Sequence, residues 1–121
     1  MPDHKFLIVE DEMLISLQLK RSLIRAGYEV CGAVGSGEQA IATARQCSPD
    51  VILMDIGLLG AMDGIEAARQ ITAFLPVVLI FTTGYPDQAL RERAAALNPA
   101  GYLIKPVYIE QIQKILRSRA G

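Results

Sequence analysis

The sequence predicts an α/β fold with one five-stranded parallel β-sheet covered by helices on both faces. Short apolar runs alternate along the chain with segments of helical periodicity, and the connections between them are short. That alternation is typical of parallel sheets built from βα units. The run from Val51 to Asp55 is apolar up to its last residue, with Pro49 before it and Gly57 after it. Such a run indicates a strand that helices cover on both sides.

The five expected strands are short runs rich in β-branched, aromatic or other apolar residues. They are Phe6 to Val9, Tyr28 to Val34, Val51 to Asp55, Val77 to Thr82, and Gly101 to Ile104. Right-handed crossovers place the helices on both faces of such a sheet. In the doubly wound, flavodoxin-like order 2-1-3-4-5, the first and third strands lie side by side. We therefore expect this (βα)₅ arrangement.

Start and stop signals predict five helices that alternate with these strands. The first helix runs for about fourteen residues and ends at Gly27, a natural left-handed stop. Ser36 with Gln39, and Asp63 with Glu66, have the spacing of a capping box and open the second and third helices. These two helices are expected to end at about Cys47 and about Phe74. The fourth helix is expected from Pro86 to Leu97, and the apolar stripe of Ile109, Ile112 and Leu116 indicates the fifth.

The helices differ in the apolar surface that they offer to a core. The first helix has two apolar sides, one made by Ile15, Leu19 and Leu23 and the other by Met13, Leu17 and Ile24. Leu14 falls instead among the polar residues Gln18, Arg21 and Arg25, so we expect it to be exposed. The fourth helix contains the run Ala94 to Ala96, which leaves little to bury. We expect this helix to be the least firmly anchored.

Composition places the chain among ordinary globular domains. Its 121 residues suit one domain, and its 51% apolar and 21% charged residues argue against disorder. Twelve basic and thirteen acidic residues leave a net charge of −1, so no basic field favours nucleic acid. The sequence has neither an apolar run of the ~18 residues that a membrane span needs nor a signal-peptide pattern. We expect a cytoplasmic protein that contacts its partners through local surfaces.

The two cysteines, Cys31 and Cys47, match no metal-binding or redox spacing. We expect both to be reduced thiols that behave as small, partly buried apolar residues.

Polar residues that could take part in chemistry lie at or just after the ends of four of the expected strands. Glu10 and Asp11 follow the first strand, Asp55 ends the third, Thr83 follows the fourth and Lys105 follows the fifth. Each alone would also suit a turn or a cap, but together they lie at one edge of the sheet. Three carboxylates and one lysine sum to −2, which a bound divalent cation would cancel. Oxygen ligands favour Mg²⁺ or Mn²⁺ over zinc.

In this order and placement, these residues resemble the conserved set of a response-regulator receiver domain of two-component signalling, and the resemblance covers essentially the whole chain. It implies that Asp55 accepts a phosphoryl group from a phosphohistidine of a histidine kinase or phosphotransfer protein. It also implies a signalling protein, not an enzyme acting on other substrates. Thr83 would be the hydroxyl residue because Gly84 follows it, although Thr82 remains an alternative.

The same resemblance implies a metal site and a switch. The cation would be held by Asp11, Asp55 and the backbone carbonyl of Gly57, with Glu10 helping through water. The peptide bond between Lys105 and Pro106 would be cis. Tyr102 resembles the aromatic residue that changes position with the threonine, although an aromatic residue there would also suit core packing.

The resemblance further suggests where partners bind. We expect the phosphodonor to dock on the first helix through Leu14, Gln18 and Arg21, and a downstream protein to bind the fourth helix, fifth strand and fifth helix. No nucleic acid or membrane is expected as a partner, and the chain should be a monomer or a weak dimer. Fifteen residues follow Pro106, just enough for the last helix, so residues 1–121 are expected to form one receiver domain without an output domain. The chain is then either a single-domain regulator or a receiver cut from a longer protein.

Departures from the family pattern and rival functions also deserve weight. The first acidic residue is Glu10, where Asp is commoner, and the stretch from Asp55 to Gly64 is one position longer than in many receivers.

A haloacid-dehalogenase-like phosphatase would need a second Asp at position 57, where this chain has Gly57. A flavin carrier would need a phosphate-binding loop where the acidic Glu10 to Glu12 would repel phosphate. A pseudo-receiver that only docks is disfavoured by the complete set of site residues.

Overall fold

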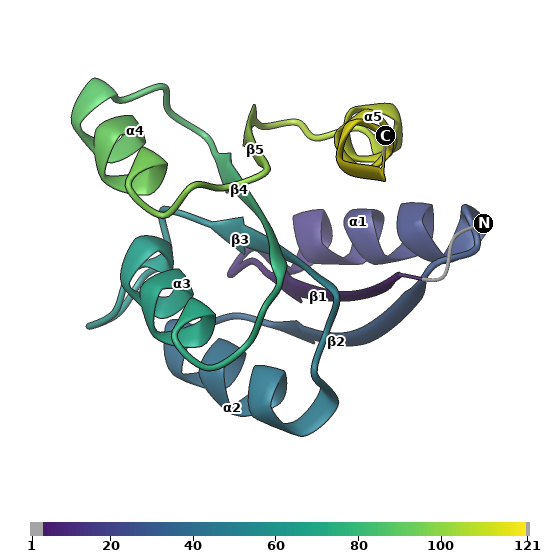
Figure 1. The fold of residues 1–121 in the computed structure, drawn as a ribbon, viewed down its shortest axis with the longest axis horizontal. Helices are drawn as coiled ribbons and strands as arrows, with labels where there is room; N and C mark the ends of the chain where they lie inside the picture. Colours follow the sequence, from purple (N-terminus) through teal and green to yellow (C-terminus); the bar gives the residue numbers. More distant parts are fainter. Residues whose placement is uncertain (1–3, 121) are drawn as a thin grey trace.

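The computed structural model describes residues 4–120, and across them it confirms the predicted fold (Figure 1). Five parallel strands form one sheet in the order β2-β1-β3-β4-β5. The strands are β1 (Lys5–Val9), β2 (Glu29–Val34), β3 (Val51–Asp55), β4 (Val78–Thr83) and β5 (Gly101–Ile104). The helices are α1 (Met13–Arg25), α2 (Gly37–Cys47), α3 (Gly64–Thr72), α4 (Gln88–Ala95) and α5 (Ile109–Ala120). Among these helices, none is both long and apolar enough to cross a membrane.

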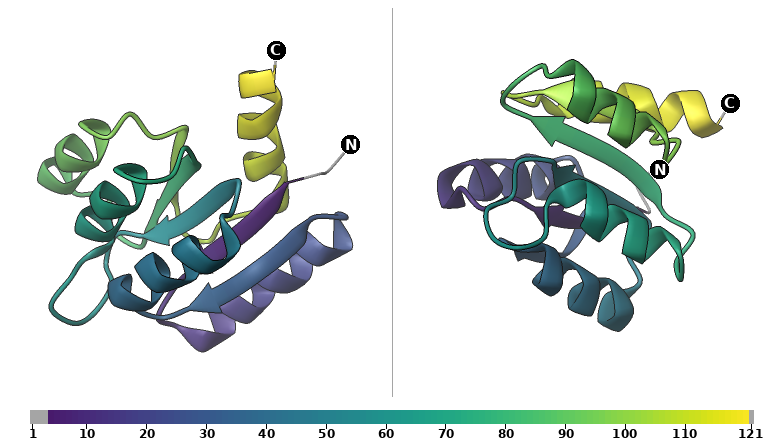
Figure 2. Two further views of the ribbon diagram at one scale, coloured as in Figure 1. Left: turned by 60° about the horizontal axis from the view of Figure 1, so that its bottom comes forward. Right: turned by 90° about the vertical axis from the view of Figure 1, so that its left-hand side faces the viewer.

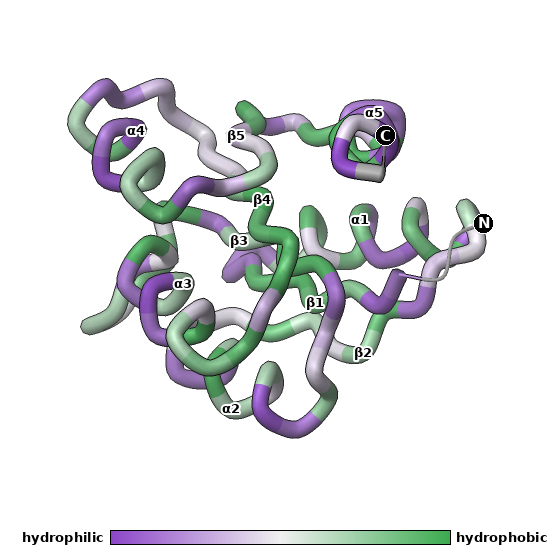
Figure 3. The backbone as a smooth tube through the Cα atoms, in the orientation of Figure 1, coloured by the Kyte–Doolittle hydropathy of each residue, from purple (hydrophilic) through white to green (hydrophobic). Residues whose placement is uncertain are grey.

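Two apolar cores lie on the two faces of the sheet. Helices α1 and α5 cover one face, and α2, α3 and α4 cover the other (Figures 1 and 2). Along β1, Phe6 and Ile8 face the α1 and α5 side, while Leu7 and Val9 face the opposite core. All five residues of β3 are buried, and the central strands are the most hydrophobic part of the backbone trace (Figure 3). Burial of each such apolar side chain contributes about 1.5–3 kcal/mol to the free energy of unfolding, so the sheet holds the residues at its edge in fixed positions.

Side-chain caps begin α2 and α3 as the sequence predicts. Ser36 Oγ accepts the Gln39 N–H at 3.1 Å, and Asp63 Oδ1 accepts the Glu66 N–H at 2.9 Å. The reciprocal half of each capping box differs. The Gln39 side chain accepts the N–H of Gly35, one residue earlier than expected, and Glu66 pairs with Arg69. Only the forward half of each predicted box is therefore present.

Several helix bounds differ from the predicted ones. Helices α3 and α4 end at Thr72 and Ala95, each two residues before the predicted ends at about Phe74 and at Leu97. Helix α4 begins after Asp87, whose Oδ1 accepts the Leu90 N–H at 3.0 Å. That cap places the start two residues beyond Pro86, since a capping side chain satisfies the first free N–H groups. Helix α1 ends at Arg25 and is followed by Gly27, which adopts a positive φ of 96° as expected for a left-handed stop.

Helix α1 packs through one of its two apolar sides only. Leu19 and Leu23 are buried against β1 and β3, whereas Met13, Leu17 and Ile24 on the second side are exposed. Leu14 is 77% exposed, as predicted. The helical wheel identifies both apolar sides, but the position of the sheet decides which of them is covered.

The predicted state of the cysteines is wrong: Cys31 and Cys47 form a disulfide. Cys31 lies on β2 and Cys47 is the last residue of α2, and their Cα atoms are 6.4 Å apart, within the usual range for a disulfide. The two residues are 16 positions apart, and they meet because α2 runs back along the strand that precedes it. Spacing rules for local metal or redox motifs do not detect a pair that the fold brings together.

Gly64 makes a close approach that no larger residue can make. A Cβ atom at this position would overlap the backbone carbonyl of Asp55, and the Gly64 N–H donates to the Ile56 carbonyl at 3.2 Å. We expect Gly64→Ala to lower the free energy of unfolding by about 2–3 kcal/mol, measured by urea denaturation. The matched change Gly84→Ala meets no atom within 4 Å and is expected to cost less than about 0.5 kcal/mol. Equal midpoints for the two variants would contradict this close packing.

Candidate functional site

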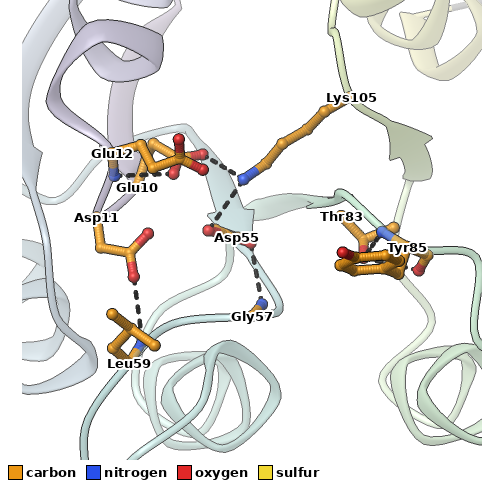
Figure 4. Close-up of polar contacts among 9 residues, drawn as sticks. All are labelled: Glu10, Asp11, Glu12, Asp55, Gly57, Leu59, Thr83, Tyr85 and Lys105. Atoms are coloured by element: carbon orange, nitrogen blue, oxygen red, sulfur yellow. Dashed lines mark hydrogen bonds and ion pairs between the residues drawn. The ribbon is translucent and has the colours of Figure 1, made fainter.

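The sheet order brings three carboxylates together at one end of the sheet. Strands β1 and β3 are paired in parallel, so Glu10 and Asp11 emerge beside Asp55 (Figure 4). Within residues 4–120, one oxygen from each of these three groups lies within 4.8 Å of the others. Glu10 is 4% exposed and Asp55 3%, whereas Asp11 is half-buried. The predicted acidic cluster is therefore present, and two of its members are almost removed from water.

Lys105 is the counter-charge of this cluster. Its Nζ lies 2.8 Å from Glu10 Oε1 and donates to Asp55 Oδ2 at 3.1 Å (Figure 4). Burial alone would lower the pKa of Lys105, but its hydrogen bonds and attraction to the two carboxylates outweigh this and raise the pKa above its ordinary value. Burial, with the nearby charge of Asp55, raises the pKa of Glu10, although Lys105 opposes that rise. The lysine therefore stays charged at neutral pH.

Backbone N–H groups hold the carboxylates in place. Asp55 Oδ1 accepts the Gly57 N–H at 2.9 Å, and Asp11 Oδ2 accepts the Leu59 N–H at 3.2 Å. Glu10 Oε2 accepts the N–H of Glu12 at 3.0 Å. The contact to Leu59 shows that the loop after β3 folds over Asp11. Sequence reasoning missed it because a backbone donor leaves no trace in residue type.

The donor set suits a hard divalent cation. Carboxylate oxygens are the ligands that Mg²⁺ and Mn²⁺ prefer, and one lysine leaves two of the three negative charges uncompensated. Gly57 follows Asp55 in the same turn, where a backbone carbonyl is a suitable further ligand. The residues present therefore fit the predicted cation.

Thr83 is near the site but does not face Asp55 in this structure. Its hydroxyl donates to the Tyr85 carbonyl at 2.9 Å and accepts the Tyr85 N–H at 3.2 Å (Figure 4). Thr83 is the last residue of β4, so its side chain points to the face covered by α4. Thr82, the alternative, lies on the opposite face and lines a groove with Lys105.

Tyr102 already points inward. Its ring packs against the core that α2, α3 and α4 cover, and its buried hydroxyl has no hydrogen-bond partner among residues 4–120. The guanidinium carbon of Arg91 lies 4.8 Å from the centre of the ring. Arg91 was not singled out from the sequence, since an arginine on an exposed helix face carries no distinctive signal.

A groove of about 630 Å³ runs beside the site, between α1 and the segment that joins β5 to α5. Gln18 and Arg21, two of the predicted docking residues, line it, whereas Leu14 does not. The Lys105–Pro106 peptide bond in its wall is cis, as predicted.

A doubly wound domain with this set of residues at its strand ends belongs to the class of receiver domains. The family model of the response regulator receiver domain matches residues 6–117, so the chain belongs to that family. The transcriptional regulatory protein PdtaR of Mycobacterium tuberculosis is 34% identical over 108 residues, covering 89% of this chain and 52% of PdtaR. The chain thus spans about half the length of the first curated relatives it matches.

Solved structures show the same fold. The signal receiver domain of a modulated diguanylate cyclase from Desulfovibrio desulfuricans G20 is 37% identical, with a TM-score of 0.90 over 96% of this chain and 92% of that chain. A response regulator from Burkholderia pseudomallei is 25% identical, with a TM-score of 0.83 over 98% of this chain and 72% of that chain. That protein was solved with a phosphorylated aspartic acid, a calcium ion and citrate.

Repulsion within the acidic cluster generates a stability prediction. Asp11→Asn is expected to raise the free energy of unfolding by about 1 kcal/mol at low ionic strength without divalent cations, because one like charge is removed while the contact to Leu59 can persist. Urea denaturation with and without Mg²⁺ measures it: Mg²⁺ should stabilise the unmodified chain more than the variant. Glu29→Gln, an exposed change on β2, is the control for net charge. A destabilised Asp11→Asn variant would show that the repulsion is already relieved.

Proposed function

We propose that Asp55 accepts a phosphoryl group from a phosphohistidine of a histidine kinase or phosphotransfer protein, as part of a two-component or phosphorelay pathway. The observation that carries this proposal is the placement of the Asp55 carboxylate between the Lys105 ammonium, the Gly57 N–H and two further carboxylates. The phosphorylated aspartic acid and calcium ion of the Burkholderia pseudomallei response regulator support the same chemistry here.

In the transfer, an Asp55 oxygen forms a bond to phosphorus as the bond between phosphorus and the histidine nitrogen breaks. Phosphoryl transfer needs mainly positioning and charge neutralisation from the protein. The Gly57 N–H orients the Asp55 carboxylate, and Lys105 stays close enough to move from Asp55 to a phosphoryl oxygen. A bound Mg²⁺ or Mn²⁺ supplies further positive charge; Asp11, Asp55 and the Gly57 carbonyl would hold it, with Glu10 acting through water.

The chain then acts by contact with other proteins and not by turning over a substrate. The phosphoryl group adds about two negative charges and three acceptor oxygens, which favour a turn of the Thr83 hydroxyl towards Asp55. That turn would break both of its hydrogen bonds to Tyr85 and reshape the surface of α4, β5 and α5, where Tyr102 lies. We place the binding site of the downstream protein on this surface.

The proposal includes the setting of the protein. We place the protein in the cytoplasm, a compartment in which disulfides such as Cys31–Cys47 are uncommon. We also propose that residues 1–121 act as a single receiver domain that is a monomer or a weak dimer and binds neither nucleic acid nor a membrane.

The phosphoacceptor assignment has a direct test. Treatment with acetyl phosphate and Mg²⁺ should add one phosphoryl group to the chain by intact-mass analysis, and Asp55→Asn should abolish the addition. Asp50→Asn, just before β3, is the matched control and should be labelled normally, because Asp50 contacts Lys5 and Val78 at the starts of β1 and β4, at the other end of the sheet from Asp55. Labelling of Asp55→Asn would refute the assignment, and an unlabelled native chain would favour the docking-only alternative.

Docking of the phosphodonor on α1 makes a second, separable prediction. Leu14 is exposed near the site end of α1, and Gln18 and Arg21 on the same helix line the adjoining groove. We expect Leu14→Asp to slow transfer from the cognate phosphodonor about ten-fold or more, since buried apolar anchors dominate interfaces. Acetyl phosphate labelling should not change.

Ile24→Asp is the matched control for this docking prediction. Ile24 is also exposed on α1, but it lies near the helix end remote from Asp55. Equal slowing by both variants would mean that α1 does not dock in this way.

A further inference from the structure

Helix α4 packs on the domain through Ala94 and the partly buried Leu90, and two of its arginines add polar contacts. Within the described chain, Gln88–Ala95 buries a single residue, Ala94. Arg91 lies over the ring of Tyr102 on β5, and Arg93 Nη1 lies 3.2 Å from Asp63 Oδ2. Because α4 buries little apolar surface, polar contacts of modest strength can shift its position. Figures 1 and 2 show α4 beside α3 on the same face of the sheet.

The partner of Arg93 belongs to the phosphoacceptor loop. Asp63 caps α3 with Oδ1 and accepts Arg93 with Oδ2. It ends the loop, residues 56–63, that begins directly after Asp55. N–H groups of the same loop hold two of the site carboxylates, through Gly57 and Leu59. Arg93 therefore joins α4 to the far end of the loop that holds the site.

We propose that the Arg93–Asp63 ion pair is a latch that stabilises the unphosphorylated position of α4 and is weakened when Asp55 is phosphorylated. The inference rests on the proposed function. Its structural basis is the Thr83 hydroxyl, which here makes two hydrogen bonds to Tyr85 in the turn that leads into α4. If Thr83 turns to a phosphoryl group, that turn loses both bonds and the start of α4 is released. Asp63 cannot follow, because it remains the cap of α3.

The exposure of the two side chains limits how far the latch can shift the position of α4. The side chains of Arg93 and Asp63 are 52% and 34% exposed, so their attraction is screened by water and salt. A contact that stabilises only one arrangement shifts the equilibrium by its own free energy and no more. The free energy of an exposed ion pair of this kind changes an equilibrium constant by about two- to five-fold. Loss of the latch should therefore tighten binding of a phosphoryl mimic by that factor.

The test is a double-mutant cycle read by the dissociation constant for beryllofluoride in the presence of Mg²⁺. Arg93→Gln removes the charge on α4, and Asp63→Asn removes its partner while keeping a good helix cap. Each single variant is expected to lower the dissociation constant about two- to five-fold, and the double variant no further than either single one. Arg117→Gln, on the exposed surface of α5, removes the same charge without a latch and should leave the constant unchanged.

The outcomes separate the latch from the proposed function. Additive effects, unchanged constants or weaker binding in the single variants would overturn the latch while leaving the phosphoacceptor assignment intact. Absence of beryllofluoride binding by the unmodified chain would overturn the proposed function itself. High salt gives an independent check, because screening should bring the constant of the unmodified chain towards that of Arg93→Gln. A salt response identical in both proteins would also contradict the latch.

Discussion

Repulsion among three carboxylates at one edge of the sheet is the constraint on which the rest of this structure depends. Glu10 and Asp55 are almost fully buried, and like charges a few ångströms apart repel strongly when water is excluded. They meet because β1 and β3 are neighbours. Lys105 and three backbone N–H groups offset part of that cost, and the remaining negative charge would attract the proposed cation.

The domain divides into parts that are anchored by different forces. The central strands and most helices bury apolar side chains, so displacing them would expose large areas to water. Helix α4 anchors less apolar surface, through Ala94 and the partly buried Leu90, and its exposed arginines contact Asp63 and Tyr102. Among residues 4–120 the buried hydroxyl of Tyr102 finds no hydrogen-bond partner, so its inward position carries a cost in free energy. Movement therefore costs the least free energy at the end of the sheet where α4 and β5 lie.

Much of the fold follows from sequence because strand runs, caps and polar residues at strand ends are local patterns. The placement of Glu10, Asp11, Asp55 and Lys105 at strand ends and the exposure of Leu14 were predictable in this way, and the strand order followed from the doubly wound topology. Other features depend on the assembled fold. Pairing of the two cysteines, the uncovered second side of α1 and the contact of Arg93 with Asp63 need relative positions of elements that no periodicity encodes. The direction of the Thr83 hydroxyl is a rotamer choice made by its turn.

The close approach of Gly64 to Asp55 has a consequence for how this loop can vary. The segment is pinned at both ends, where Gly57 binds the Asp55 side chain and Gly64 rests on its backbone. An added residue must therefore be accommodated between these two points, and lengthening an exposed loop costs little. Between these points the Leu59 N–H holds Asp11, whereas a Cβ atom added at Gly60 would meet no atom within 4 Å. Residues inserted at Gly60, beyond the contact of Leu59 with Asp11, would change what an approaching protein meets above the pocket while the carboxylates beneath keep their backbone donors.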